Sequence, residues 1–126
     1  MDAIKKWIEI ADDDLEDSKI LLAGKRYSGA LLHLHQAVEK GLKAHCFIKD
    51  GDIPPKSHDL LQLLYHSDLP QETIDLELLK QLSLSYVRLR YPDLDRQYYS
   101  NKDTVLKLIH FAEGLYLWIK QQLPKN

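Results

Sequence analysis

The stretch LHLHQAVEKGLKAH, residues 32–45, concentrates side chains that can bind ligands or react. It holds three of the six histidines, a glutamine, a glutamate and two lysines. Placed at ~100° per residue on a helix, four hydrogen-bond donors fall within about 80° of one another. These four residues, the polar stripe, are His33, Gln36, Lys40 and Lys43. Because the stripe contains no carboxylate, it suits the oxygens of a phosphate or nucleotide, with an ordinary solvated helix face as the alternative.

A second group of such side chains lies in YVRLRYPDLDRQYY, residues 86–99. It combines three arginines with four tyrosines around Pro92. Arginine offers a forked set of donors to phosphate, and tyrosine can stack on a base. Asp93 and Asp95 lie in the same stretch, so surface ion pairs and aromatic packing at a helix end are the alternative.

His58 is the third candidate and lies in PPKSHDL, residues 54–60. At the start of a helix it either donates to a ligand or caps a loop. The sequence thus supplies eight candidate residues for binding a nucleotide or phosphate: His33, Gln36, Lys40, Lys43, His58, Arg88, Arg90 and Tyr91.

The spacing of the histidines argues against a metal site. On a helix, His33 and His35 point about 200° apart, and neither HExxH nor ExxH occurs. No glycine elbow frames a serine, and Cys46, the one cysteine, is expected to be a small core residue. The glycines are isolated, so no phosphate-cradling loop is present. We therefore predict no catalytic residue, no metal site and no cofactor.

The elements that must position these residues are predicted to be helices. Apolar residues recur every three or four positions, and no segment alternates with period two. Helices are expected over residues 3–23, 27–49 and 57–66, from Pro70 to before Pro92, and from Ser100 to before Pro124. Ser57 and Ser100, the latter with Asp103, are the expected N-caps. The pattern predicts an all-α fold, a four-helix up-and-down bundle with an additional short helix in the connection between the second and third long helices.

The second expected helix has two further faces besides the polar stripe. Its core face, roughly 160° from the stripe, consists of Leu31, Leu34, Val38, Leu42 and His45. One flank carries a row of small side chains, Ala30, Ala37 and Ala44. Such a row lets another helix or a ligand approach closely, although alanine is also the best helix former.

Composition restricts the class of protein. With 126 residues, 44% hydrophobic and 29% charged, the chain fits one globular domain, residues 1–126. A net charge of −2 gives no general attraction to nucleic acid or to a membrane, so phosphate binding requires a local patch. No apolar run is long enough to span a bilayer, and the N-terminus lacks the apolar core of a signal peptide. We expect a cytoplasmic protein without a membrane partner.

Three motifs in order resemble the HEPN domain (higher eukaryotes and prokaryotes nucleotide-binding). They are Tyr27, Ala30, His33, Gln36-Ala37-Val38-Glu39-Lys40 and Leu42-Lys43-Ala44; Ser57-His58-Asp59-Leu60; and Tyr86 with Arg90-Tyr91-Pro92-Asp93. Ala11, Asp14 and Leu15 of the first expected helix agree with the family pattern. Gly41 departs from it, because the family more often has alanine there. The resemblance covers nearly the whole chain.

The resemblance implies a helical bundle, usually a homodimer. It also implies pairing with a minimal nucleotidyltransferase encoded as a separate chain, often in a toxin–antitoxin arrangement. Many HEPN proteins are metal-independent ribonucleases that use an arginine and a histidine separated by four to six residues. Here no histidine follows the arginines of residues 88–96 until His110, and the formal match of Arg26 with His33 lies at the wrong end of the chain.

The leading hypothesis is therefore a noncatalytic homodimer that binds a nucleotide or RNA phosphate and acts with the nucleotidyltransferase. One alternative is a ribonuclease toxin with a divergent active site. The other is a purely structural protein–protein interaction module.

Overall fold

The computed structural model describes residues 2–90 and 101–125. These residues form helices and no strand, which confirms the all-α prediction. The helices are α1 (Asp2–Ala23), α2 (Tyr27–Asp50), α3 (Leu60–Ser67), α4 (Leu76–Arg88) and α6 (Lys102–Gln121). The short α3 lies in the connection between α2 and α4, as predicted. None of the described helices is both long and apolar enough to cross a membrane.

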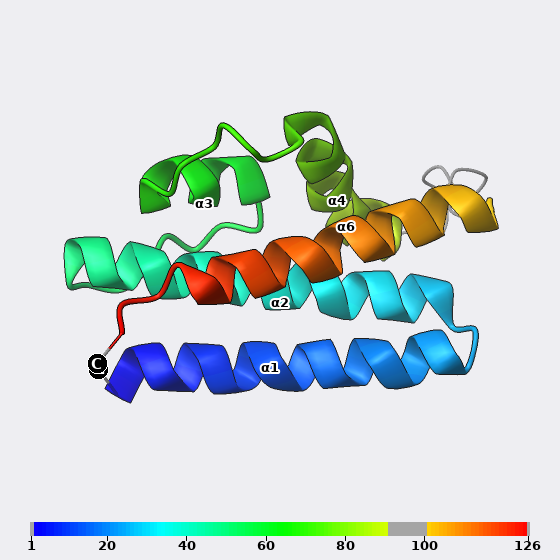
Figure 1. Ribbon diagram of the computed structural model, residues 1–126, viewed down its shortest axis with the longest axis horizontal. Helices are drawn as coiled ribbons and strands as arrows, with labels where there is room; N and C mark the ends of the chain where they lie inside the picture. The colour runs from blue at the N-terminus through cyan, green and yellow to red at the C-terminus, as the bar shows by residue number, and fades with distance from the viewer. Residues whose placement is uncertain (1, 91–100, 126) are drawn as a thin grey trace.

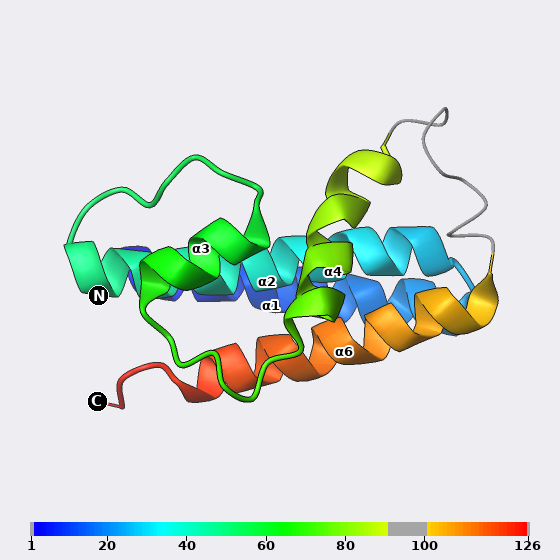
Figure 2. The same ribbon diagram turned by 90° about the horizontal axis from the view of Figure 1, so that it is seen from above.

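The helices are arranged around α2 (Figure 1). Helix α1 runs antiparallel to α2 along its length, and α6 runs alongside α2. Helices α3 and α4 cover the side of α2 that faces away from α1. Seen from above, α4 crosses α2 and α6 at a steep angle (Figure 2). As a result, α2 is covered on several sides, and each of its polar faces meets a different neighbour.

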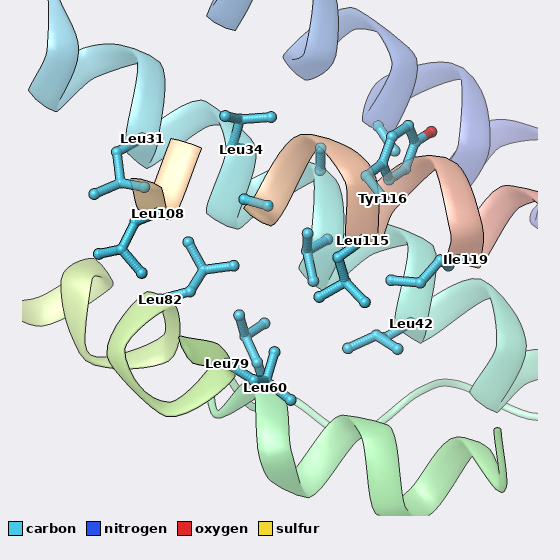
Figure 3. Close-up of a cluster of buried hydrophobic side chains, with 14 of the residues drawn as sticks. Leu31, Leu34, Leu42, Leu60, Leu79, Leu82, Leu108, Leu115, Tyr116 and Ile119 are labelled. Atoms are coloured by element: carbon cyan, nitrogen blue, oxygen red, sulfur yellow. The ribbon is translucent and has the colours of Figure 1, made fainter. Parts of the chain in front are cut away.

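Leucines of α2, α3, α4 and α6 meet in one core (Figure 3). The expected core face of α2 is confirmed, since its leucines and Val38 are at most 1% exposed. The largest buried side chains from the other helices are Leu60, Leu63 and Leu64 of α3, Leu79 and Leu82 of α4, and Leu108, Ile109, Tyr116 and Ile119 of α6. Removal of this apolar area from water is the main force that holds the helices together.

Gly41 lets α6 pass close to α2. A Cβ atom at this position would lie 2.9 Å from Cγ2 of Ile119 and 3.3 Å from Cε1 of Tyr116. The same pair of helices is joined by a hydrogen bond, 2.9 Å long, between Nε2 of His45 and the carbonyl oxygen of Ile119. On the flank of α2, Ala30, Ala37 and Ala44 are fully buried, so packing between helices explains that row of small residues.

The N-cap of α3 and the first residue of α4 differ from the expected ones. The Asp59 side chain, and not Ser57, caps α3 by accepting hydrogen bonds from the N–H groups of Leu61 and Gln62. Helix α4 begins after Asp75, whose carboxylate accepts from the N–H of Leu78. The prediction of a helix start at Pro70 is therefore wrong, because the capping aspartate decides where the helix begins.

The cap of α6 is also one residue from the expected position. The Asn101 side chain accepts hydrogen bonds from the N–H groups of Asp103 and Thr104. Asn101 takes the role expected for Ser100, which itself lies outside the described residues.

Candidate functional site

Helix α2 carries a row of three polar side chains, of which two, His35 and Glu39, meet Tyr86 of α4 and His58 of the segment before α3. His35, Glu39 and Lys43 are spaced by four residues, so they lie within about 80° of one another on the helix. All three residues are at most 8% exposed. One carboxylate oxygen of Glu39 accepts a hydrogen bond from Nζ of Lys43 at 3.0 Å. The buried carboxylate is thus paired with a cation one turn further along the same helix.

His58 reaches Glu39 from the segment that precedes α3. Its Nδ1 lies 2.9 Å from the second carboxylate oxygen of Glu39, although about half of the His58 side chain is exposed. The segment is held in place because the N–H of Leu60 donates to Oγ of Ser83 on α4. A carboxylate at Nδ1 places a ring proton there, so Nε2 is the nitrogen left for other partners.

Tyr86 of α4 forms a platform against His58. The two rings stack with their centroids 4.2 Å apart and their planes 16° apart. The Tyr86 hydroxyl lies 3.4 Å from Nε2 of His58 and also accepts a hydrogen bond from Arg90. The guanidinium carbon of Arg90 is 4.8 Å from the Tyr86 ring centroid, a cation–π distance. Arg90 is exposed, so this planar cation is presented at the surface beside the imidazole.

His35 lies beneath this group and is fully buried. Neither of its ring nitrogens has a hydrogen-bond partner among the described residues. Its Nδ1 is 3.8 Å from the Glu39 carboxylate, and its ring is 5.0 Å from that of Tyr86. Burial lowers the pKa of His35 to about 4, against the opposing effect of Glu39, so the imidazole is neutral near pH 7.

Six of the residues described above form one continuous group that runs from the core to the surface. We call it the α2–α4 cluster: His35, Glu39, Lys43, His58, Tyr86 and Arg90. Its inner part holds a neutral histidine and a carboxylate paired with a lysine. Its outer part holds an arginine and a histidine on an aromatic ring, which suits an anion approaching from solvent.

The polar stripe of α2 is divided between two environments. His33 and Lys40 face α1, where the buried Asp14 carboxylate lies 2.9 Å from His33 Nδ1 and 2.7 Å from Lys40 Nζ. The expectation of donors without acceptor carboxylates is therefore wrong for these two residues, because α1 supplies the acceptor, and also for Lys43, which pairs with Glu39 of its own helix. Gln36 is half-buried. For His33, Gln36 and Lys40, ligand binding stays a prediction.

Lys43, His58 and Arg90 are the predicted residues that the structure brings together. Arg88 is half-buried at the C-terminal end of α4, and Tyr91 lies outside the described residues. His35 and Glu39 are members of the site that were not predicted from the sequence, and Tyr86 was one of the four tyrosines of the group at residues 86–99 but not one of the eight named candidates. The sequence does contain a signal for them. His35, Glu39 and Lys43 are spaced by four residues, as are Tyr86 and Arg90, and this spacing places each set on one face of its helix.

One group of potential metal ligands occurs among the described residues. Ligand atoms of Asp14, Asp17 and His33 lie within 4.8 Å of one another. Lys40 already holds the Asp14 carboxylate, and its positive charge opposes the binding of a cation there. Cys46 is equally unsuited to chemistry, because burial raises the pKa of its thiol to about 11.

Comparison with known proteins identifies related sequences and folds. Residues 4–122 match the HEPN domain family. The crystal structure of TT1696 from Thermus thermophilus is similar, with a TM-score of 0.77 and 25% sequence identity. That similarity covers 98% of this chain and 100% of TT1696. No functionally curated protein matches the sequence.

Proposed function

The chain belongs to the HEPN domain family, and we propose that it binds the phosphate of a nucleotide or RNA at the exposed end of the α2–α4 cluster. The observation that carries the proposal is the placement of Arg90 and His58 against the Tyr86 ring. An arginine guanidinium binds two phosphate oxygens at once, and the Nε2 side of His58 adds a further polar contact.

The charges within the cluster support an anion over a cation as the ligand. Lys43 compensates the Glu39 carboxylate at 3.0 Å, so Glu39 leaves no net negative charge at the site. Arg90 is exposed, and the Tyr86 ring restricts where its guanidinium cation can lie. A local positive centre of this kind can bind phosphate although the whole chain carries a net charge of −2.

The proposal includes the partners that the family resemblance implies. The protein acts as a noncatalytic homodimer beside a separately encoded minimal nucleotidyltransferase, as in a toxin–antitoxin pair. The proposed partnership would be supported by a gene for such an enzyme next to the gene for this chain, and by co-purification of the two products. A nucleotidyltransferase that fails to bind the purified chain would contradict it.

Calorimetric titration with ATP tests the binding proposal. Wild-type protein is expected to bind ATP, and Arg90→Ala to weaken binding at least tenfold, because a charge-assisted contact is worth about 1.5–3 kcal/mol. Arg26→Ala is the matched control, since Arg26 is also an exposed arginine but lies at the start of α2. Equal affinities of Arg90→Ala and wild type, or no binding at millimolar ATP, would refute the proposal.

The Glu39–His58 contact favours a ribonuclease as the second candidate. A histidine oriented by a carboxylate, with Nε2 turned toward an arginine-bearing surface, is an arrangement used for general base catalysis. This candidate predicts RNA cleavage and growth arrest on expression, both lost in His58→Ala and in Arg90→Ala. Cleavage that survives both substitutions would exclude this site.

A further inference from the structure

A cavity of about 460 Å³ opens next to His58, between α3 and α4. Its apolar wall is formed by Leu61 of α3 and by Leu84 and Val87 of α4. Leu84 is 38% exposed and Val87 is 46% exposed, so both aliphatic side chains are accessible to a ligand in the cavity. His58 belongs both to this cavity and to the α2–α4 cluster, so the two sites are continuous.

The cavity also contains a few polar groups at defined positions. Lys80 is exposed on the same face of α4 as Leu84 and Val87. Oγ of Ser83 accepts a hydrogen bond from the N–H of Leu60, which leaves its hydroxyl proton for a ligand. An apolar wall with a small number of polar groups, at a volume of several hundred Å³, is typical of small-molecule sites.

We propose that this cavity holds the base and ribose of a nucleotide whose phosphate lies on Arg90 and His58. This inference rests on the function proposed above and specifies the ligand as a nucleoside phosphate unit, in place of a bare phosphate. Ser83 and Arg90 are seven residues apart, about 10 Å along the helix axis, which is comparable to the length of a nucleoside monophosphate. The apolar wall accepts the faces of the base, and Lys80 and Ser83 supply the hydrogen-bonding groups for the base or ribose.

Titrations with AMP and with inorganic phosphate, compared in the wild type and in a filled-cavity variant, test this proposal. The wild type is expected to bind AMP at least tenfold more tightly than inorganic phosphate. Leu84→Trp fills the cavity and is expected to remove this preference, while inorganic phosphate still binds. The control is Leu117→Trp, because Leu117 is similarly exposed, at 45%, but lies on α6 outside the cavity. If Leu84→Trp does not fold, Val87→Trp replaces it.

The possible results separate this proposal from the one on which it rests. Loss of AMP preference in Leu84→Trp alone supports the cavity as the base site. The cavity proposal is overturned if the wild type binds AMP and phosphate with equal affinity, or if the AMP preference survives Leu84→Trp. This holds even if Arg90→Ala abolishes phosphate binding. No binding of either ligand overturns both proposals. A short single-stranded RNA that binds more tightly than AMP, and loses this advantage in Leu84→Trp, identifies RNA as the source of the nucleotide.

Discussion

His35 shows how a single buried side chain links the candidate site to the stability of the protein. Burial lowers its pKa to about 4 in the folded state, whereas an unfolded histidine titrates at ~6.5. Below pH ~6.5 the unfolded chain therefore binds a proton that the folded protein does not bind until about pH 4. The free energy of unfolding falls as the pH drops through this interval, and no further loss from His35 occurs below it.

We expect the free energy of unfolding to decrease by on the order of 2 kcal/mol from His35 alone between pH 7 and pH 5. Urea denaturation at the two pH values measures this difference. His35→Leu should show a smaller decrease, although His45, whose pKa is also lowered by burial, keeps part of it. His110→Leu, at an exposed position, should behave as wild type. An equal decrease in His35→Leu and wild type would contradict the assignment.

At the scale of the elements, α2 determines most of the structure because each of its faces meets a different partner. Leucines face the core, His33 and Lys40 face α1, and His35 and Glu39 face Tyr86 of α4 and His58. Such coverage on several sides requires small residues wherever another helix passes close. Gly41 is the clearest case, since α6 crosses directly over it.

Gly41→Ala is expected to lower the free energy of unfolding by about 1 kcal/mol, because overpacking against Ile119 and Tyr116 outweighs the gain in helix propensity. Gly114→Ala is the matched control. The Cβ position of Gly114, on α6, is open, so alanine there should stabilise the protein by about 0.5–1 kcal/mol. Chemical denaturation measures both effects. Stabilisation of similar size in the two variants would contradict the expected overpacking at position 41.

The pairing of α1 with α2 depends on the carboxylate of Asp14. This carboxylate is 6% exposed and binds both His33 and Lys40. Asp14→Ala leaves Lys40 partly buried without its partner, which should lower the free energy of unfolding by about 2 kcal/mol. Asp13→Ala, at the adjacent exposed position, should change it by less than about 0.5 kcal/mol. Equal effects of the two substitutions in thermal or urea denaturation would contradict this role of Asp14.

For the whole molecule, the sequence predicted the fold well and the site only in part. The repeat of apolar residues every three or four positions was sufficient for the helices and for the core face of α2, because burial dictates that pattern. A helical wheel of α2 could not show that Asp14 of α1 would pair with Lys40, since the direction of a side chain does not identify the neighbour. The site was harder to predict for the same reason, because His58, Glu39 and Tyr86 come from three separate segments.

The proposed ligand lies at the junction of α2, α4 and the segment before α3. Nucleotide binding at this junction should perturb different residues from binding along the polar stripe between α1 and α2. The first should perturb His58, Tyr86 and Arg90, and the second should perturb His33 and Lys40.

A titration of isotope-labelled protein with AMP, followed by two-dimensional NMR, distinguishes the two sites most directly. We expect saturable chemical-shift changes at His58, Tyr86, Arg90 and Leu84, with little change at His33 and Lys40. Changes confined to His33 and Lys40, or no changes at millimolar AMP, would contradict binding at the α2–α4 cluster.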